Sequence, residues 1–152
     1  MSTSIGCRCA LAVFLTAAPL FASAAETYQC VENDRTGFLW NGQNMERGRL
    51  PGANMVLAGE FPLEGGTPTE AVLQIEGIRS PLAMGCTVPF FGQKPVLCTS
   101  GSHTLVLDRD SGRFTLARQF GWVFEDLHTG APNEDTFTVG WGMCTRGPGA
   151  AK

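Results

Sequence analysis

The stretch from His103 to Arg118 constrains the fold most, because it has the pattern of a complete β-hairpin. Leu105 and Leu107 recur with the period of two that is typical of a half-buried strand. Phe114 and Leu116 repeat this period on the return. The Asp-Arg-Asp-Ser-Gly segment between the two halves supplies turn-forming residues, and its glycine can adopt a positive φ. The sequence therefore predicts two antiparallel strands joined by a tight turn.

Other short segments carry the same kind of pattern, and turn-forming residues separate them. We expect strands at Tyr28–Glu32, Thr36–Trp40, Met55–Phe61, Ala71–Glu76, Met84–Val88, Pro95–Thr99, Phe120–Phe124 and Thr136–Cys144. We expect a turn at 33–35 and a loop over 45–54. Beyond the N-terminal segment, no ten-residue helical periodicity is present. These features predict an all-β fold, namely a single antiparallel small barrel or sandwich of about eight short strands.

The N-terminal segment has the features of a secretory signal peptide. Arg8 provides a positive charge, the run from Cys9 to Leu20 is apolar, and Ala22-Ser-Ala24 matches the small-residue cleavage pattern. The apolar run is too short for a permanent transmembrane helix. We therefore expect residues 1–25 to be a signal peptide, 26–145 a β-domain and 146–152 a disordered tail. The expected location of the protein is the periplasm or the extracellular space.

Four cysteines follow the expected signal peptide: Cys30, Cys86, Cys98 and Cys144. An even number of cysteines in an exported chain favours two disulfide bonds. They lack the C-x₂₋₄-C spacing of structural zinc sites, so we expect no metal. Cys86 and Cys98 flank one loop, which predicts a local bridge. Cys30 and Cys144 then lie on the first and last strands, which must be neighbours if the sheet closes.

Charge and composition argue against several classes of function. Without the signal peptide, ten Lys and Arg face fourteen Asp and Glu, which gives a formal net charge of −4. This balance disfavours nucleic acids and anionic membrane surfaces as partners. A protein partner is compatible with it, while the oligomeric state is left open.

No catalytic constellation stands out, so we expect a protein that is not an enzyme and needs no cofactor. His103 and His128 are the only histidines, and Ser111 lacks the nucleophile-elbow context of a Ser-His-Asp hydrolase. An acidic cluster within 125–135 has enough oxygen atoms to suggest calcium, but it lacks the spacing of an EF-hand loop. A solvated acidic face is the favoured interpretation.

Aromatic residues are abundant for a small turn-rich domain, and we expect most of them in the core. They are Trp40, Trp122, Trp141, Phe38, Phe114, Phe120, Phe124 and Phe137. The adjacent pair Phe90 and Phe91 is different, because two neighbours on one strand cannot both point inward. The pair lies between the cysteines of the expected local bridge. It is a candidate recognition loop, or alternatively a loop that covers an open barrel end.

Short motifs resemble those of a loosely defined set of small exported bacterial proteins of unassigned function. The motifs are Tyr28-Gln-Cys30, Thr36-Gly-Phe-Leu-Trp-Asn-Gly42, Arg113-Phe114 and Gly142-Met-Cys144. A fainter similarity is to the periplasmic inhibitors of C-type lysozyme, which are small disulfide-bonded β-barrels with an early Tyr-x-Cys. Their inhibitory loop carries Ser-Gly-Ala. Here Ser111-Gly112 matches that loop, and Arg113 replaces the alanine.

These observations together predict an exported, non-enzymatic, disulfide-stabilised β-domain that acts as an interaction or envelope-associated module. One alternative is a periplasmic inhibitor of a hydrolase such as lysozyme, in which Ser111 and Arg113 would contact the enzyme. The other is a carrier of a small apolar ligand, which would bind inside the barrel. A large internal apolar pocket would favour the carrier, and a protruding loop at 110–113 would favour the inhibitor.

Overall fold

The computed structural model describes residues 25–40, 43–89, 94–119 and 135–147, which contain nine β-strands and no helix. The described part of the chain accordingly has no helix that could cross a membrane. The strands are β1 (Glu26–Trp40), β2 (Met45–Leu50), β3 (Asn54–Gly59), β4 (Thr69–Ile75), β5 (Leu82–Thr87), β6 (Val96–Thr99), β7 (His103–Leu107), β8 (Arg113–Arg118) and β9 (Asp135–Arg146).

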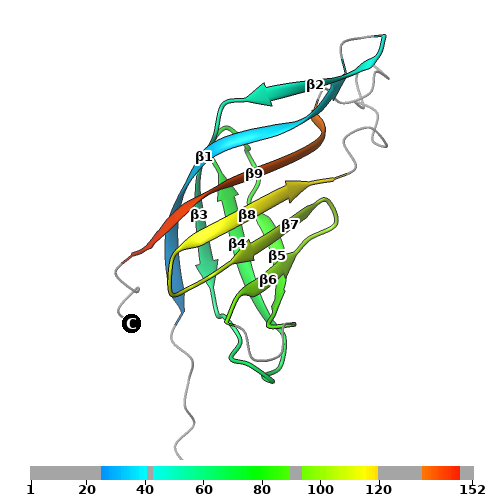
Figure 1. Ribbon diagram of the computed structural model, residues 1–152. Coiled ribbons are helices and arrows are strands. Elements are labelled where there is room, and N and C mark those ends of the chain that lie inside the picture. The colour runs from blue at the N-terminus through cyan, green and yellow to red at the C-terminus, as the bar shows by residue number, and fades with distance from the viewer. Residues whose placement is uncertain (1–24, 41–42, 90–93, 120–134, 148–152) are drawn as a thin grey trace, which may run out of the picture.

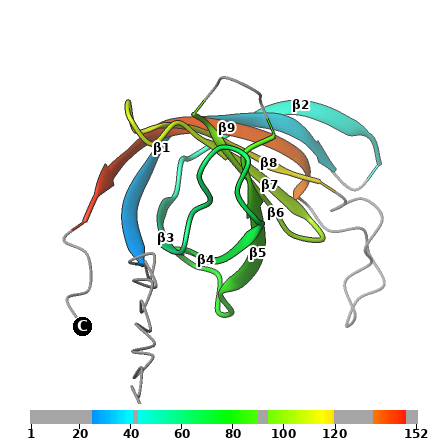
Figure 2. The ribbon, with the colours of Figure 1, turned by 90° about the horizontal axis from the view of Figure 1, so that it is seen from below.

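Eight of these strands close into an antiparallel barrel. Each strand from β3 to β8 pairs with the next strand along the chain. The strand β1 closes the ring, because it pairs with β3 on one edge and with β9 on the other. Figure 2 looks into this ring and shows β2 lying outside it. The fold is thus a closed barrel rather than a sandwich.

The strand β1 is longer than the sequence predicts. The segment 33–35, expected to be a turn, continues the strand, and the pairing with β9 shifts register between Glu32 and Asp34. A β-bulge of this kind adds one residue and bends the strand without ending it. The expected strands at 28–32 and 36–40 are therefore one strand, which extends beyond the barrel (Figure 1).

The strand β2 is a second difference from the sequence prediction, because it lies in the expected loop over 45–54. It pairs with the far half of β1, from Arg35↔Leu50 to Trp40↔Met45. The other edge of that half of β1 pairs with the start of β9. Together, β2, Arg35–Trp40 of β1 and Asp135–Gly140 of β9 form a sheet, called here the extension (Figure 1). The end of β8 pairs with the other edge of β9 from Thr138 to Gly140.

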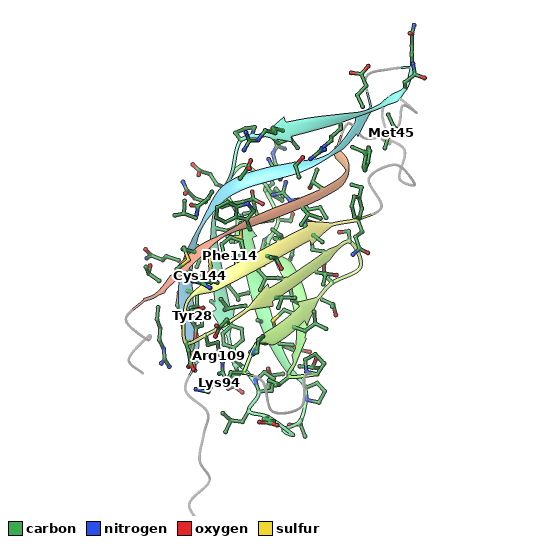
Figure 3. The ribbon with its side chains drawn as sticks, viewed as in Figure 1. Tyr28, Met45, Lys94, Arg109, Phe114 and Cys144 are labelled. Carbon is green, nitrogen blue, oxygen red and sulfur yellow. A yellow bond between two sulfur atoms is a disulfide. The ribbon has the colours of Figure 1, made fainter. Side chains whose placement is uncertain are left out.

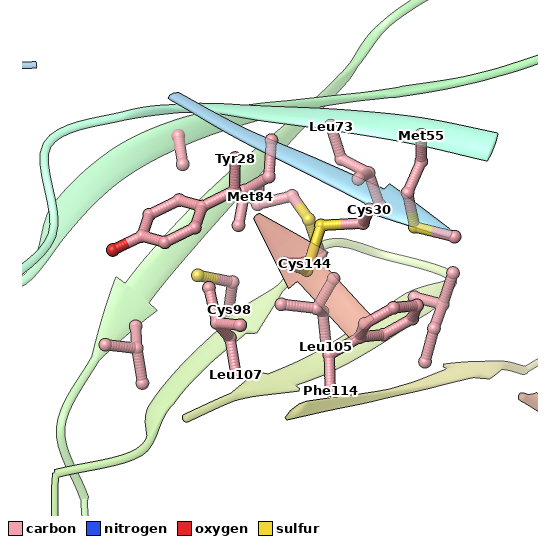
Figure 4. Close-up of a cluster of buried hydrophobic side chains, with 14 of the residues drawn as sticks. Tyr28, Cys30, Met55, Leu73, Met84, Cys98, Leu105, Leu107, Phe114 and Cys144 are labelled. Atoms are coloured by element: carbon pink, nitrogen blue, oxygen red, sulfur yellow. A yellow bond between two sulfur atoms is a disulfide. The ribbon is translucent and has the colours of Figure 1, made fainter. Parts of the chain in front are cut away.

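Apolar side chains fill the interior of the barrel. Each strand contributes alternate residues, as the period-two pattern predicts. Leu57, Leu73, Val96, Leu105 and Leu107 are completely buried. Figure 4 shows side chains from several strands converging with the disulfide of Cys30 and Cys144 in this core. An eight-stranded barrel is just wide enough for such a packed interior.

Both predicted disulfides are confirmed. Cys86 pairs with Cys98 across β5 and β6, and Cys30 pairs with Cys144 across β1 and β9. The second bridge joins the first and last strands, as barrel closure requires. Two disulfides are compatible with an oxidising extracellular compartment.

The hairpin at 103–118 is also confirmed. Leu105 lies opposite Leu116 and Leu107 lies opposite Phe114, with all four side chains buried. The last strand is longer than expected, because β9 includes Arg146, which we had assigned to the tail.

Candidate interaction surface

The outer face of β9 exposes several large apolar side chains. Phe137, Val139, Trp141 and Met143 point outward and are 43, 38, 54 and 44 % exposed. The residues between them point inward, and Thr138 and Cys144 are buried. The strand thus presents a row of four large apolar side chains to solvent.

Two apolar residues of the neighbouring strand β1 lie beside this row on the same face of the sheet. Val31 lies directly opposite Met143, and Phe38 lies directly opposite Phe137. Both β1 side chains are at least half exposed. Directly opposed residues of antiparallel strands lie on the same face with their Cβ atoms about 5 Å apart. We call these six residues the β9 stripe: Val31, Phe38, Phe137, Val139, Trp141 and Met143.

Small inward residues explain why these aromatic side chains face out. A Cβ atom built on Gly140 would lie 1.7 Å from Glu32 Oε1. One built on Gly142 would lie 2.0 Å from the main-chain O of Val31 and 2.8 Å from Phe114 Cε1. The space beside these two positions is therefore already filled by β1 and by Phe114. At both positions glycine alone fits inside, and the bulky residues next to them lie outside.

For the described aromatic side chains, this arrangement differs from the expectation that most of them lie in the core. Of the expected residues whose side chains the structure describes, Phe114 is buried, whereas Phe38, Phe137 and Trp141 are exposed. The Gly-x-Gly spacing in β9 separates the small residues from the bulky ones in the sequence, but only the assembled strands show that the small residues face inward.

Arginines border the stripe on both sides. Arg47 lies opposite Phe38 across β1 and β2, and Arg113 lies opposite Met143 across β8 and β9. Arg49 lies opposite Thr36 on the same outer face. All three arginines are exposed. An apolar centre with cationic borders suits a partner surface that is apolar and acidic.

Arg49 and Asp34 form a two-pronged ion pair. Arg49 Nε lies 3.2 Å from Asp34 Oδ1, and Nη2 lies 2.5 Å from Oδ2. The hydrogen bonds from Arg49 hold the pKa of Asp34 below its usual value. Among the described residues, no carboxylate forms an ion pair with Arg47. Arg47 is therefore the less neutralised of these two arginines.

The opposite end of the barrel contains an open cleft of about 490 Å³. The carboxylate of Glu26 interacts with three side chains that line this cleft. It accepts a hydrogen bond from Tyr28 Oη at 2.5 Å. It also forms ion pairs with Arg146 Nη2 at 3.1 Å and with Arg109 Nη1 at 3.8 Å. Figure 3 shows Tyr28, Lys94 and Arg109 at this end and Met45 at the other. Burial, together with the hydrogen bond to Glu26, raises the pKa of Tyr28 to about 12. The polar groups of this cleft pair with one another and tie β1 to β9 and to the β7–β8 turn.

A buried carboxylate lies inside the barrel near the bulge of β1. Glu32 is 4 % exposed, and its Oε2 accepts a hydrogen bond from Ala53 N at 3.1 Å. Arg35 Nε lies 3.8 Å from the same oxygen, and Arg35 Nη2 donates to Pro51 O at 2.9 Å. Burial raises the pKa of Glu32. These bonds attach the segment between β2 and β3 to β1, which gives this pair a structural role.

Two of the sequence-predicted recognition residues are described. Ser111 and Arg113 are exposed at the β7–β8 turn, and Arg113 borders the β9 stripe. Phe90 and Phe91 lie outside the described residues, as does the expected acidic cluster except for Asp135, which begins β9.

The β7–β8 turn is compact. Gly112, at φ 72°, donates from its N to Asp108 O at 2.8 Å, and its own carbonyl accepts from Cys144 N at 2.7 Å. Ser111 Oγ donates to Asp108 Oδ2 at 2.7 Å. These bonds hold the turn against β9, whereas a loop that enters an enzyme cleft has to protrude.

His103 pairs with Arg118 across β7 and β8, and its imidazole makes one local hydrogen bond. Its Nδ1 lies 2.8 Å from Ser102 Oγ, and its main-chain N and O bond to Ser100. Burial lowers the pKa of His103. Within the described ranges, no carboxylate orients this imidazole and no cluster of three metal-binding side chains occurs. His128 lies outside those ranges.

Comparisons with protein families, with curated proteins and with solved structures find no match to this chain.

Proposed function

We propose that this protein is an exported, non-enzymatic interaction module that binds another protein through the β9 stripe. The supporting observation is the contiguous exposure of six large apolar side chains on neighbouring strands. Single exposed apolar residues are common, but contiguous patches bordered by polar groups are typical of binding sites. Trp and Arg, which dominate binding energies in protein interfaces, are both present here.

Export is part of this proposal. It is supported by the two disulfides, which are compatible with an oxidising compartment, and by the signal-like N-terminal sequence. The motif resemblance to small exported bacterial proteins points in the same direction.

The packed interior gives little support to the ligand-carrier alternative. Carriers of this size hold an apolar ligand in a central cavity, but here leucine, valine and methionine side chains occupy the centre. The lysozyme-inhibitor alternative stays a prediction. Purified protein should slow lysis by a C-type lysozyme, and Arg113→Ala should weaken the effect, if this alternative is correct.

Site-specific photo-crosslinking in the producing cells tests the proposed function. A photoreactive amino acid replaces Val139 in the stripe or, as a matched control, Val72 on β4, which is similarly exposed at 45 %. We expect position 139 to capture one defined protein that position 72 does not, and Trp141→Ser to abolish the capture. Identical products at both positions, or capture of only a second copy of this chain, would contradict the proposal.

A further inference from the structure

The strand β2 is the terminal strand of the sheet order, and β1 is the one described strand that pairs with it. At Arg47 and Arg49, the edge of β2 that faces away from β1 pairs with no described strand. Figure 1 shows β2 at the margin of the extension. It contains no proline, so every residue carries a main-chain N–H group. Such an edge can accept a further strand.

The main-chain direction identifies which residues face that edge. Thr36 Oγ1 donates to Gly48 O at 3.0 Å, so the Gly48 carbonyl faces β1. Successive residues of a strand direct their main-chain groups to opposite edges. The N–H and C=O groups of Arg47 and Arg49 therefore point away from β1, toward the edge that pairs with no described strand.

The side chains of the same two residues lie on one face. Arg47 lies opposite Phe38, and Arg49 lies opposite Thr36, on the outer face that carries the β9 stripe. A strand added to this edge would place its own residues directly opposite the two arginines. Acidic residues at alternate positions would face the two guanidinium groups.

The same charges oppose pairing between two copies of β2. A two-fold axis normal to the sheet relates antiparallel edges of identical chains. Two registers bring most of β2 into contact: one places Arg47 opposite its own copy, and the other places Arg47 opposite Arg49. Like charges directly opposite each other destabilise a strand pair. The edge is thus unfavourable for self-association and favourable for an acidic strand.

We propose that β2 binds an extended acidic segment of a partner protein as an additional antiparallel strand. Main-chain hydrogen bonds form at Arg47 and Arg49. One carboxylate of the segment pairs with the guanidinium group of Arg47, and a second lies beside Arg49, which keeps its ion pair with Asp34. This inference rests on the proposed function and specifies the chemistry of the partner.

Nuclear magnetic resonance titration with synthetic peptides tests the inference. The probe is the peptide Thr-Glu-Thr-Glu-Thr-Glu. It is prepared in two forms, with the main-chain nitrogen methylated either at the threonines or at the glutamates, so that those residues lose their N–H donors. In the proposed register the glutamate N–H groups face β2 and the threonine N–H groups face away. We expect the threonine-methylated peptide to shift the amide signals of Arg47 and Arg49, and the glutamate-methylated peptide to lose most of its affinity.

Charge variants complete the test. Arg47→Glu should weaken peptide binding about fivefold or more, because it replaces a cross-strand ion pair by repulsion. Arg79→Glu is the matched control, since it makes the same change at an exposed position in the β4–β5 turn and should leave affinity unchanged. A peptide with lysine in place of glutamate should bind Arg47→Glu better than the unchanged protein.

Three results would overturn the inference: equal binding of both methylated peptides, shifts located away from β2, or binding of anionic phosphatidylglycerol vesicles at Arg47 without binding of the peptide. None of them affects the crosslinks expected at position 139. Conversely, loss of those crosslinks with retained peptide binding at β2 would contradict only the proposed use of the stripe.

Discussion

The single tyrosine of this protein is a sensitive reporter of its structure. Tyr28 is almost completely buried, packs edge-on against Phe61 with ring centroids 5.5 Å apart, and donates to the carboxylate of Glu26. Burial is the first cause of its raised pKa, and the negative charge of Glu26 adds to it. The phenol is thus stabilised in its protonated form.

We predict that Tyr28 of the native protein loses its proton at a higher pH than an ordinary tyrosine does. Ultraviolet absorbance should report phenolate formation with a pKa of about 12, against the ordinary value of 10.0 in the unfolded chain. Because the folded pKa is the higher one, this contribution to stability is complete below pH 10 and is lost as the pH rises toward 12. In Glu26→Gln the titration should move to lower pH. A native titration at the ordinary value would contradict the burial of this side chain.

Glu32 should make the free energy of unfolding depend on pH from about 4.5 upward. Burial raises its folded pKa above 4.5, so the folded state holds the proton more tightly than the unfolded state. The associated stability is complete below 4.5 and is lost as the pH rises through the folded pKa, at no more than about 1.4 kcal/mol per pH unit. Urea denaturation across this range should show that Glu32→Gln removes the slope. Glu70→Gln, at an exposed position of β4, is the control, and it should retain the slope.

At the scale of elements, local pattern identified the strands that alternate cleanly and missed the others. Residues 45–50 read Met-Glu-Arg-Gly-Arg-Leu, which has charges and a glycine where an alternating strand has apolar residues. This strand forms through pairing with β1, and its residues are mostly exposed. The segment 33–35 has turn-forming residues, but continuous pairing with β9 keeps it in the strand.

Which set of alternating side chains on a strand points into the barrel was equally hard to predict. Alternation places Phe137, Val139 and Trp141 on one face, but it does not tell which face is inside. Glu32 and Phe114, which are remote in sequence, occupy the space beside Gly140 and Gly142 and so decide the register. The candidate surface could therefore be recognised only after the strands had been assembled.

Two phenylalanines distinguish the inside of the barrel from its outside. Phe114→Ala removes a buried ring and should lower the free energy of unfolding by about 3 to 5 kcal/mol. Phe137→Ala removes a ring that is 43 % exposed and pairs with Phe38, so the loss should stay below about 1 kcal/mol. Urea denaturation of both variants checks this difference. Equal losses would mean that the β9 stripe stabilises the fold rather than serving as a surface.

At the scale of the whole molecule, the cysteines predicted the topology correctly. The pairing of Cys30 with Cys144 required the first and last strands to be neighbours, and β1 and β9 make the longest strand pairing in the barrel. The antiparallel all-β class, the hairpin at 103–118 and both bridges could be predicted from the sequence, whereas the choice between barrel and sandwich required the assembled strands. The extension could not, because nothing local indicates that β1 continues past the barrel.

The two disulfides should contribute unequally to stability. They close segments with sequence separations of 114 and 12 residues. In the chain-entropy relation these loops correspond to about 5 and about 3 kcal/mol. The double variant Cys30→Ala with Cys144→Ala should therefore unfold at lower urea concentration than Cys86→Ala with Cys98→Ala. The reverse order would show that barrel closure does not depend on the long-range bridge.

The described chain begins and ends at the same pole of the barrel. Tyr28 lies opposite Arg146, and Gly147 N donates to Thr27 O at 2.7 Å. The extension lies at the other end of β1, whose fifteen residues span about 50 Å (Figure 1). A support or tether attached beside Glu26 or Gly147 therefore holds the molecule by one end and orients β2 away from the attachment point. In immobilised binding assays, coupling at these two positions should consequently give equivalent access to that strand.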